Sequence, residues 1–286
     1  MKHTFKVTAI LILLFLTAQV VGLFIVDQYI DKQKTIPGKT VYKALPYNIE
    51  RPDIKPIYSY LYILLAVLIG TGVLLLLIRF KKNLLWKTWY FLSVWIVTGV
   101  ALSAFLNQSV SILIAFFLAA YKVLRPALII QNLTEVLMYG GIAAIFVPIL
   151  NLLSAFILLI LISIYDMYAV WHSKHMIKLA QFQADNKVFP GLLIPYPAAK
   201  SSDGKKKIKS KIKTAILGGG DIAFPLLFAG TVMKSFGFLP TLIIPVFAAL
   251  SLLSLLLLAE KGKFYPAMPF ITFGCLVGFA AVYLMF

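Results

Sequence analysis

The chain has 286 residues, of which 61% are hydrophobic and only 13% are charged, and its mean hydropathy of +0.94 excludes an ordinary soluble domain. The formal net charge is +17, but the basic residues lie in short links between apolar runs, which argues against a nucleic-acid partner. The single cysteine, Cys275, excludes an internal disulfide and a cysteine-built metal site, and we expect it to be a small core residue.

Apolar runs separated by charged residues and prolines predict an all-α, polytopic membrane protein with nine transmembrane helices. The predicted spans lie near 7–26, 59–78, 88–106, 109–124, 133–148, 149–171, 214–236, 239–259 and 264–286. The links at Asn107 and at Pro148 are tight. No clear cleavage site follows the first apolar run, so we interpret it as a span rather than a signal peptide.

Most of the 27 lysine and arginine residues fall in links on the same side as the N-terminus. The positive-inside rule therefore predicts a cytoplasmic N-terminus and an exterior C-terminus. We divide the chain into a six-helix part, 1–171, a basic cytoplasmic loop, 172–213, and a three-helix part, 214–286. We interpret the loop as a flexible linker whose lysines contact anionic lipid headgroups, with a regulatory or processed loop as the alternative.

Two acidic residues lie well inside apolar runs, whereas the rest of the ten lie in loops or near span ends. Asp166 lies five residues before Trp171, where the sixth span ends, and Asp221 lies seven residues after Thr214, where the seventh begins. At a rise of 1.5 Å per residue, both carboxyl groups lie roughly 8–10 Å below the same membrane surface. A charged, unpaired carboxylate at this depth is strongly unfavourable, so this pair is a candidate functional site.

Two such acids on antiparallel helices would share one proton, because two adjacent anions in a low dielectric repel each other. The pair could then hydrolyse a peptide bond. The charged carboxylate takes a proton from the attacking water, while the protonated one polarises the carbonyl oxygen and helps the amine to leave. This chemistry requires neither a metal nor a cofactor.

Three glycines, Gly218, Gly219 and Gly220, directly precede Asp221. Consecutive glycines weaken a helix and leave backbone groups free to pair with an unwound substrate, which favours an active site. A packing or hinge segment beside an acid that is paired within the bundle would show the same features. From the residues alone, both interpretations stay open.

Three short motifs follow one another along the chain. Tyr165–Asp166 lies late in one span, the G-x-G-D run Gly218–Asp221 lies early in the next, and Pro266–Ala267 begins the last. In this order they resemble the presenilin and signal peptide peptidase family of intramembrane aspartyl proteases, and the compact size resembles its prokaryotic, archaeal members. Type IV prepilin peptidases also carry G-x-G-D, but the Pro-Ala element argues against them.

The resemblance implies that Asp166 and Asp221 are the catalytic pair and that Gly218 and Gly220 are the motif glycines. Pro266–Met268 would match the family's Pro-Ala-Leu element, which lies beside the pair and helps to receive substrate. Met268 replaces leucine, and its similar volume should preserve the shape. We expect bulky substitution at Gly218 or Gly220 to damage cleavage more than folding, and Gly219, the variable position of the motif, to tolerate change best.

The expected partners are transmembrane-helix substrates and membrane lipid, with a homo-oligomer as a further option and the plasma membrane of a prokaryote as the expected location. No cofactor is expected, and His172 and His175, which have helical metal-ligand spacing, are interpreted as an interfacial pair because no third ligand lies near. Gly274 and Gly278 form a G-x-x-x-G that predicts helix packing. An ion or proton leak channel or transporter using the same acids is the alternative function, and a scaffold that only binds helices is a third.

Overall fold

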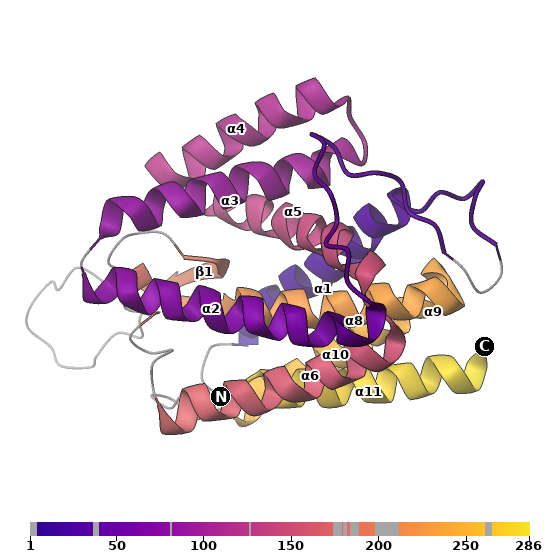
Figure 1. The fold of residues 1–286 in the computed structure, drawn as a ribbon. Coiled ribbons are helices and arrows are strands. Elements are labelled where there is room, and N and C mark those ends of the chain that lie inside the picture. The colour runs from indigo at the N-terminus through magenta and orange to yellow at the C-terminus, as the bar shows by residue number, and fades with distance from the viewer. Residues whose placement is uncertain are drawn as a thin grey trace, which may run out of the picture.

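The computed structural model describes residues 5–36, 40–80, 82–125, 127–173, 179, 182–183, 189–197, 212–260 and 265–286. Helices dominate, and they run roughly side by side along one direction (Figure 1). The main elements are α1 (Phe5–Gln28), α2 (Ser59–Arg79), α3 (Asn83–Ser103), α4 (Gln108–Leu124), α5 (Leu128–Phe146), α6 (Leu152–Met167), β1 (Gly191–Pro197), β2 (Ile212–Gly218), α8 (Gly219–Phe236), α9 (Phe238–Thr241), α10 (Ile243–Leu258) and α11 (Met268–Met285).

Within the described residues, seven helical segments are long and apolar enough to cross a membrane. They contain α1, α2, α3, α5, α6, α10 and α11, and the segment that contains α10 also includes α9. Helix α4 is apolar but shorter, with 17 residues, and α8 is not among the seven. The chain is therefore a mostly helical, multi-pass integral membrane protein, as the composition predicted.

Two tight links predicted from the sequence are helix boundaries in the structure. The Asn107 side chain accepts a hydrogen bond of 2.9 Å from the backbone N–H of Ser109 and caps α4. Asn151 does the same at α6, accepting from the N–H of Ser154 at 2.7 Å, just after a 3₁₀ turn that contains Pro148. Each boundary satisfies a backbone donor that has no partner within its helix.

A two-stranded antiparallel hairpin corrects the prediction of an all-α chain. Strand β1 pairs with β2 so that Gly191 lies opposite Gly218 and Ile194 lies opposite Ala215. Side chains alternate along β2, with Ala215 and Leu217 buried and Ile216 exposed, which is the period of a strand. The span predicted over 214–236 is therefore wrong in its first turn, because these residues are a strand and the helix begins at Gly219.

The helices pack around two central ones, α1 and α8. Helices α3, α4 and α5 lie together on one side and α6, α10 and α11 on the other, with α1 and α8 between them (Figure 1). Helix α8 contacts α1, α5, α6 and α11, so it lies at the centre of the bundle. Helix α2 lies at the edge, packs mainly against α6, and buries few of its residues.

The packing role predicted for Gly274 and Gly278 is confirmed. A Cβ atom at Gly274 would lie 2.5 Å from the carbonyl oxygen of Phe247, and one at Gly278 would lie 2.9 Å from the Cα of Ile244. The two glycines thus let α11 approach the backbone of α10 closely. Cys275, between them, is fully buried, as expected of a core residue.

Candidate active site

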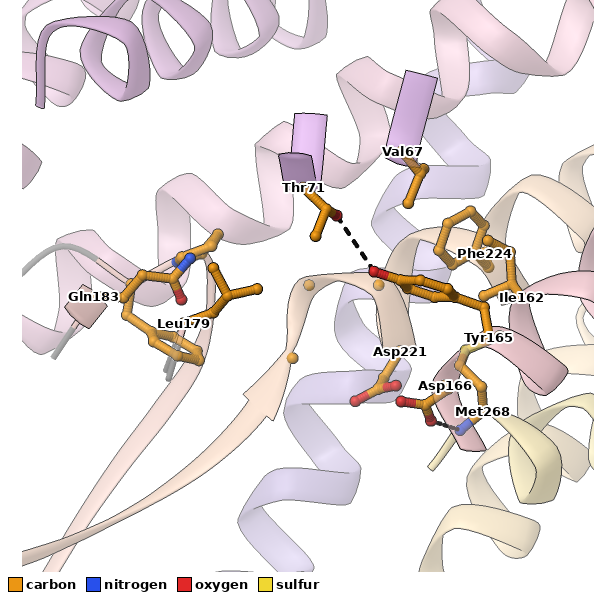
Figure 2. A pocket seen from close by; sticks show the side chains of 15 residues that line it. Val67, Thr71, Ile162, Tyr165, Asp166, Leu179, Gln183, Asp221, Phe224 and Met268 are labelled. Atoms are coloured by element: carbon orange, nitrogen blue, oxygen red, sulfur yellow. Dashed lines mark hydrogen bonds between the residues drawn. The ribbon is translucent and has the colours of Figure 1, made fainter. Parts of the chain in front are cut away.

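A cavity of about 250 Å³ lies where the C-terminal end of α6 meets the starts of α8 and α11. The hairpin and α2 close its other sides, and most of the lining side chains are apolar (Figure 2). The lining residues are Val67, Thr71, Ile162, Tyr165, Asp166, Leu179, Gln183, Phe189, Pro190, Gly218, Gly219, Gly220, Asp221, Phe224 and Met268.

Asp221 is placed by an abrupt change from strand to helix. Gly218 ends β2 with an extended backbone, φ −65° and ψ 150°, and Gly219 is the first residue of α8. Asp221 follows in the first helical turn, where its carboxyl group interacts with the backbone of Gly218. A carboxylate at this position also faces the positive end of the helix dipole.

Asp166 comes from the last turn of α6 and is only 6% exposed. One of its carboxyl oxygens accepts a hydrogen bond of 3.1 Å from the backbone N–H of Met268, the first residue of α11. The N-terminus of α11 therefore supplies a donor and a favourable dipole to this acid. The bond connects Asp166 to the Pro266–Met268 element, which the sequence could not show.

The two carboxyl groups point toward one another across the cavity (Figure 2). They come together although α6 and α8 run in opposite directions and the residues are far apart in the chain (Figure 1). The sequence predicted this juxtaposition, although it counted 214–221 as helix, whereas 214–218 belong to β2.

The three glycines differ in the space around them. A Cβ at Gly218 would lie 3.1 Å from a carboxyl oxygen of Asp221, and one at Gly220 would lie 3.4 Å from the Phe224 ring. A Cβ at Gly219 would lie 2.8 Å from the hydroxyl of Tyr139, the closest of the three contacts. The structure therefore argues against the expectation that Gly219 tolerates change best, because the side chain of α5 already occupies that space.

The other predicted site residues lie at or next to the cavity. Tyr165 lines it, and its hydroxyl donates a hydrogen bond of 3.4 Å to the side chain of Thr71 on α2 (Figure 2). Met268 lines it as well, whereas Pro266 is buried just before α11 and Ala267 is the residue that precedes the helix. Helix α11 thus begins at Met268, four residues later than the predicted span.

Several lining residues were not predicted from the sequence, among them Thr71 on α2 and Phe189 and Pro190 before β1. Nothing in their local sequence marks them, because they reach the site only through the packing of α2 and the hairpin. Within the described part of the chain, no group of three or more His, Cys, Asp and Glu side chains could hold a metal ion. His172 stacks on Tyr168, and His175 lies outside the described residues.

Two solved structures are similar in fold to this chain. A solved structure described as a presenilin family intramembrane aspartate protease, in space group C222, matches with a TM-score of 0.63 and 19% identity over 98% of this chain and 99% of that one. A structure with the same description in space group P2 matches with a TM-score of 0.61 and 21% identity, over 96% and 97%. No curated protein matches the chain.

A family model described as signal-peptide peptidase, presenilin aspartyl protease matches residues 21–286. The resemblance read from the three motifs is confirmed, and so is the expectation of an intramembrane aspartyl protease. With nearly its whole length matched, this multi-pass membrane protein belongs to the signal-peptide peptidase and presenilin family of aspartyl proteases.

Proposed function

We propose that Asp166 and Asp221 are the catalytic pair and that they hydrolyse peptide bonds within transmembrane helices. The observation that carries this proposal is the approach of the two carboxyl groups across a cavity beside a glycine-rich turn from strand to helix. Both acids sit in the walls of a largely apolar cavity, where a substrate carbonyl and one water have room to meet them.

The pair shares one proton, because two adjacent carboxylates in a site of low dielectric repel each other. The ionised carboxylate removes a proton from a water molecule as its oxygen attacks the scissile carbonyl carbon. The protonated carboxyl donates to the carbonyl oxygen and stabilises the tetrahedral intermediate. Collapse of the intermediate breaks the C–N bond, and a proton passes to the departing amine. The carboxyl group that took its proton from water supplies the proton to the amine, and the other carboxylate takes one back from a hydroxyl of the intermediate, so the pair again holds a single shared proton.

The substrate must be extended at the cut, because a helix engages its own carbonyl groups and keeps water from them. Strand β2 ends at Gly218, beside Asp221, and offers a template for an extended segment. Gly218 and Gly220 carry no side chains that would keep the substrate backbone from the acids. Tyr165 and the Pro266–Met268 element complete the surface that receives the segment.

Nine membrane spans account for the segments best. The seven long apolar helical segments are joined by α4, with 17 residues, and by α8, whose first turn carries Asp221. With the N-terminus in the cytoplasm, the catalytic pair lies in the cytoplasmic third and the C-terminus is exterior. The site then forms between the six-helix part, 1–171, and the three-helix part, 214–286.

The basic loop, 172–213, contains regular structure, because strand β1 lies inside it and strand β2 begins at its end. Its lysine-rich part, 198–211, lies outside the described residues, and its contact with lipid headgroups stays a prediction. The plasma membrane of a prokaryote as the location, and a homo-oligomer as the working form, belong to the same proposal.

The test is replacement of each acid by its uncharged isostere, Asp166→Asn and Asp221→Asn, in the purified full chain in detergent micelles. Each variant should lose cleavage of a fluorogenic peptide with one apolar transmembrane segment by at least about 10²-fold, because each removes one half of the acid–base pair. Asp53→Asn, an exposed loop aspartate, is the matched control and should cleave as the wild type does. If either single variant kept near wild-type activity with an unchanged melting temperature, the two-aspartate mechanism would be wrong.

A further inference from the structure

A buried polar cluster lies behind the hairpin, between α3, α4 and α5. We call it the Glu135 cluster, and its members are Tyr90, Lys122, Gln131, Glu135 and Tyr139. All are at most 5% exposed, and Glu135 has no exposed surface. None of them takes part in the proposed hydrolysis, and a buried ion pair brings little net stability, so the cluster calls for another explanation.

Glu135 is held by donors on both of its carboxyl oxygens. One oxygen accepts from Lys122 Nζ at 2.5 Å, from the Tyr90 hydroxyl at 3.0 Å and from Gln131 Nε2 at 3.2 Å. The other accepts a short hydrogen bond from the hydroxyl of Tyr139. The lysine balances the charge, and the surrounding donors fix both the carboxylate and the ring of Tyr139 in place.

The same face of α5 holds strand β1. Gln131 Nε2 also lies 2.8 Å from the carbonyl oxygen of Phe189 and 3.0 Å from that of Gly191. The neighbouring Asn132 pairs with the backbone of Leu193 in both directions, accepting from its N–H at 2.9 Å and donating to its carbonyl at 3.0 Å. Helix α5 therefore fixes the position of β1, and through β1 that of β2.

Tyr139 reaches the turn from strand to helix itself. A Cβ built on Gly219 would lie 2.8 Å from the Tyr139 hydroxyl and 3.3 Å from its Cε1 atom. Gly219 starts α8 two residues before Asp221, so the Tyr139 ring packs against the backbone that leads to this acid. Because Glu135 accepts a hydrogen bond from the Tyr139 hydroxyl, the ring has one fixed position.

We propose that Tyr139, held by Glu135, is a positioning residue that sets where the backbone at Gly219 lies and thereby where the carboxyl group of Asp221 sits. The proposal rests on Asp221 being one of the catalytic pair. It explains why a charged cluster is buried beside the hairpin, and why the variable position of the G-x-G-D motif is a glycine here. A displacement of about 1 Å at a catalytic group can lower a rate by about 10²-fold, so the position of the Tyr139 ring matters for the rate of cleavage.

A double-mutant cycle between Gly219→Ala and Tyr139→Phe tests the contact. Gly219→Ala should lower kcat for the fluorogenic transmembrane peptide at least about tenfold with KM changed less than about threefold, because the new methyl displaces Asp221 without altering the rest of the cavity. Tyr139→Phe removes the closest atom, so the double variant should recover at least about fivefold over Gly219→Ala. A simple loss of packing would instead make the double variant worse than either single one.

Tyr90→Phe is the matched control, because it also removes one hydroxyl that donates to Glu135, while no Tyr90 atom is among the nearest neighbours of Gly219. Tyr90→Phe should not rescue Gly219→Ala. Equal rescue by both phenylalanine variants, or rescue by neither, would overturn the proposal.

Should Gly219→Ala not fold, the single variants still decide. At matched melting temperatures Tyr139→Phe must lower kcat more than Tyr90→Phe, and equal kcat values would overturn the proposal. Cleavage by Asp166→Asn and Asp221→Asn tests the proposed function separately. If they are inactive while the cycle shows no rescue, only the role of Tyr139 is wrong.

Discussion

The space around Gly218 is limited by the carboxyl group of Asp221 itself. A Cβ there would lie 3.1 Å from an oxygen of Asp221, whereas at Gly220 the nearest atom is a ring carbon of Phe224 at 3.4 Å, an ordinary contact. The two motif glycines are thus unequal for the smallest substitution, although a bulky side chain at either would enter the cavity. We therefore expect alanine substitution at these glycines to change the rate of cleavage without a matching change in the stability of the fold.

Gly218→Ala should therefore lower kcat about tenfold, because the acid must shift by a few tenths of an ångström, and it should leave the melting temperature nearly unchanged. Gly220→Ala is the matched control and should lower kcat by no more than about twofold. Steady-state cleavage of the fluorogenic peptide and thermal unfolding in the same detergent measure both effects. Equal losses at the two positions would contradict this account of Asp221.

Single residues also show where the sequence was informative and where it was not. The approach of Asp166 to Asp221 was predicted by assuming helix on both sides, and the structure brings the two side chains together although 214–218 form a strand. Glu135 was assigned to a span end because the predicted helix began at 133, whereas α5 begins at Leu128. The spacing of Gln131, Glu135 and Tyr139 by four residues was a readable sign of a polar helix face. Its cation, Lys122, comes from another helix and could not be inferred.

Among the elements, the hairpin is held to α5 by side chains rather than by a third strand. Asn132→Ala would leave the N–H and carbonyl of Leu193 without their partner, and we expect cleavage to fall at least about threefold, because β1 and the turn at Gly219 lose part of their support. Hydrogen–deuterium exchange offers a local readout. The amide of Leu193 should exchange faster, while those of Leu192 and Ile194, which face β2 in an antiparallel ladder, should stay protected. Unchanged exchange at Leu193 would show that the asparagine does not hold the strand.

The hairpin was also the element that the sequence did not reveal. Residues 214–217 read Thr-Ala-Ile-Leu, and so short an apolar run fits the start of a buried helix as well as a strand. These residues form a strand because they pair with 191–197, and this pairing spans a stretch of chain too long to be inferred from the local sequence. The boundary capped by Asn107 was by contrast visible in the sequence as a tight link, and the tight link at Pro148 lies in the 3₁₀ turn just before the Asn151 cap.

In the whole molecule, the end of α8 away from Asp221 is fastened to the rest of the bundle by Lys234. Its Nζ donates to the carbonyl oxygens of Pro148 at 3.1 Å and Leu150 at 2.6 Å, in the turn between α5 and α6. Thirteen residues of helix, roughly 20 Å, separate it from Asp221. Stability and chemistry are therefore served by opposite ends of one helix.

Lys234→Met keeps the apolar stem but removes both bonds, and each hydrogen bond to a charged group is worth about 1.5–3 kcal/mol. We expect the melting temperature to fall by roughly 5 °C or more, while kcat well below that temperature stays within about twofold. Lys32→Met, which removes an exposed pair with Asp27, is the control and should change neither value. A large loss of kcat in folded Lys234→Met would mean that the two ends are coupled.

The clamp of Asn132 on Leu193 makes the hairpin one-sided. An isolated pair of strands has two edges that can accept a neighbour, but side chains of α5 occupy the edge of β1. A bound peptide that adds a strand then has a single edge on which to align, the edge of β2. Among the side chains of β2 whose burial is described, Thr214 and Ile216 are exposed, so preference among cleavage sites would depend on these positions outside the catalytic motifs.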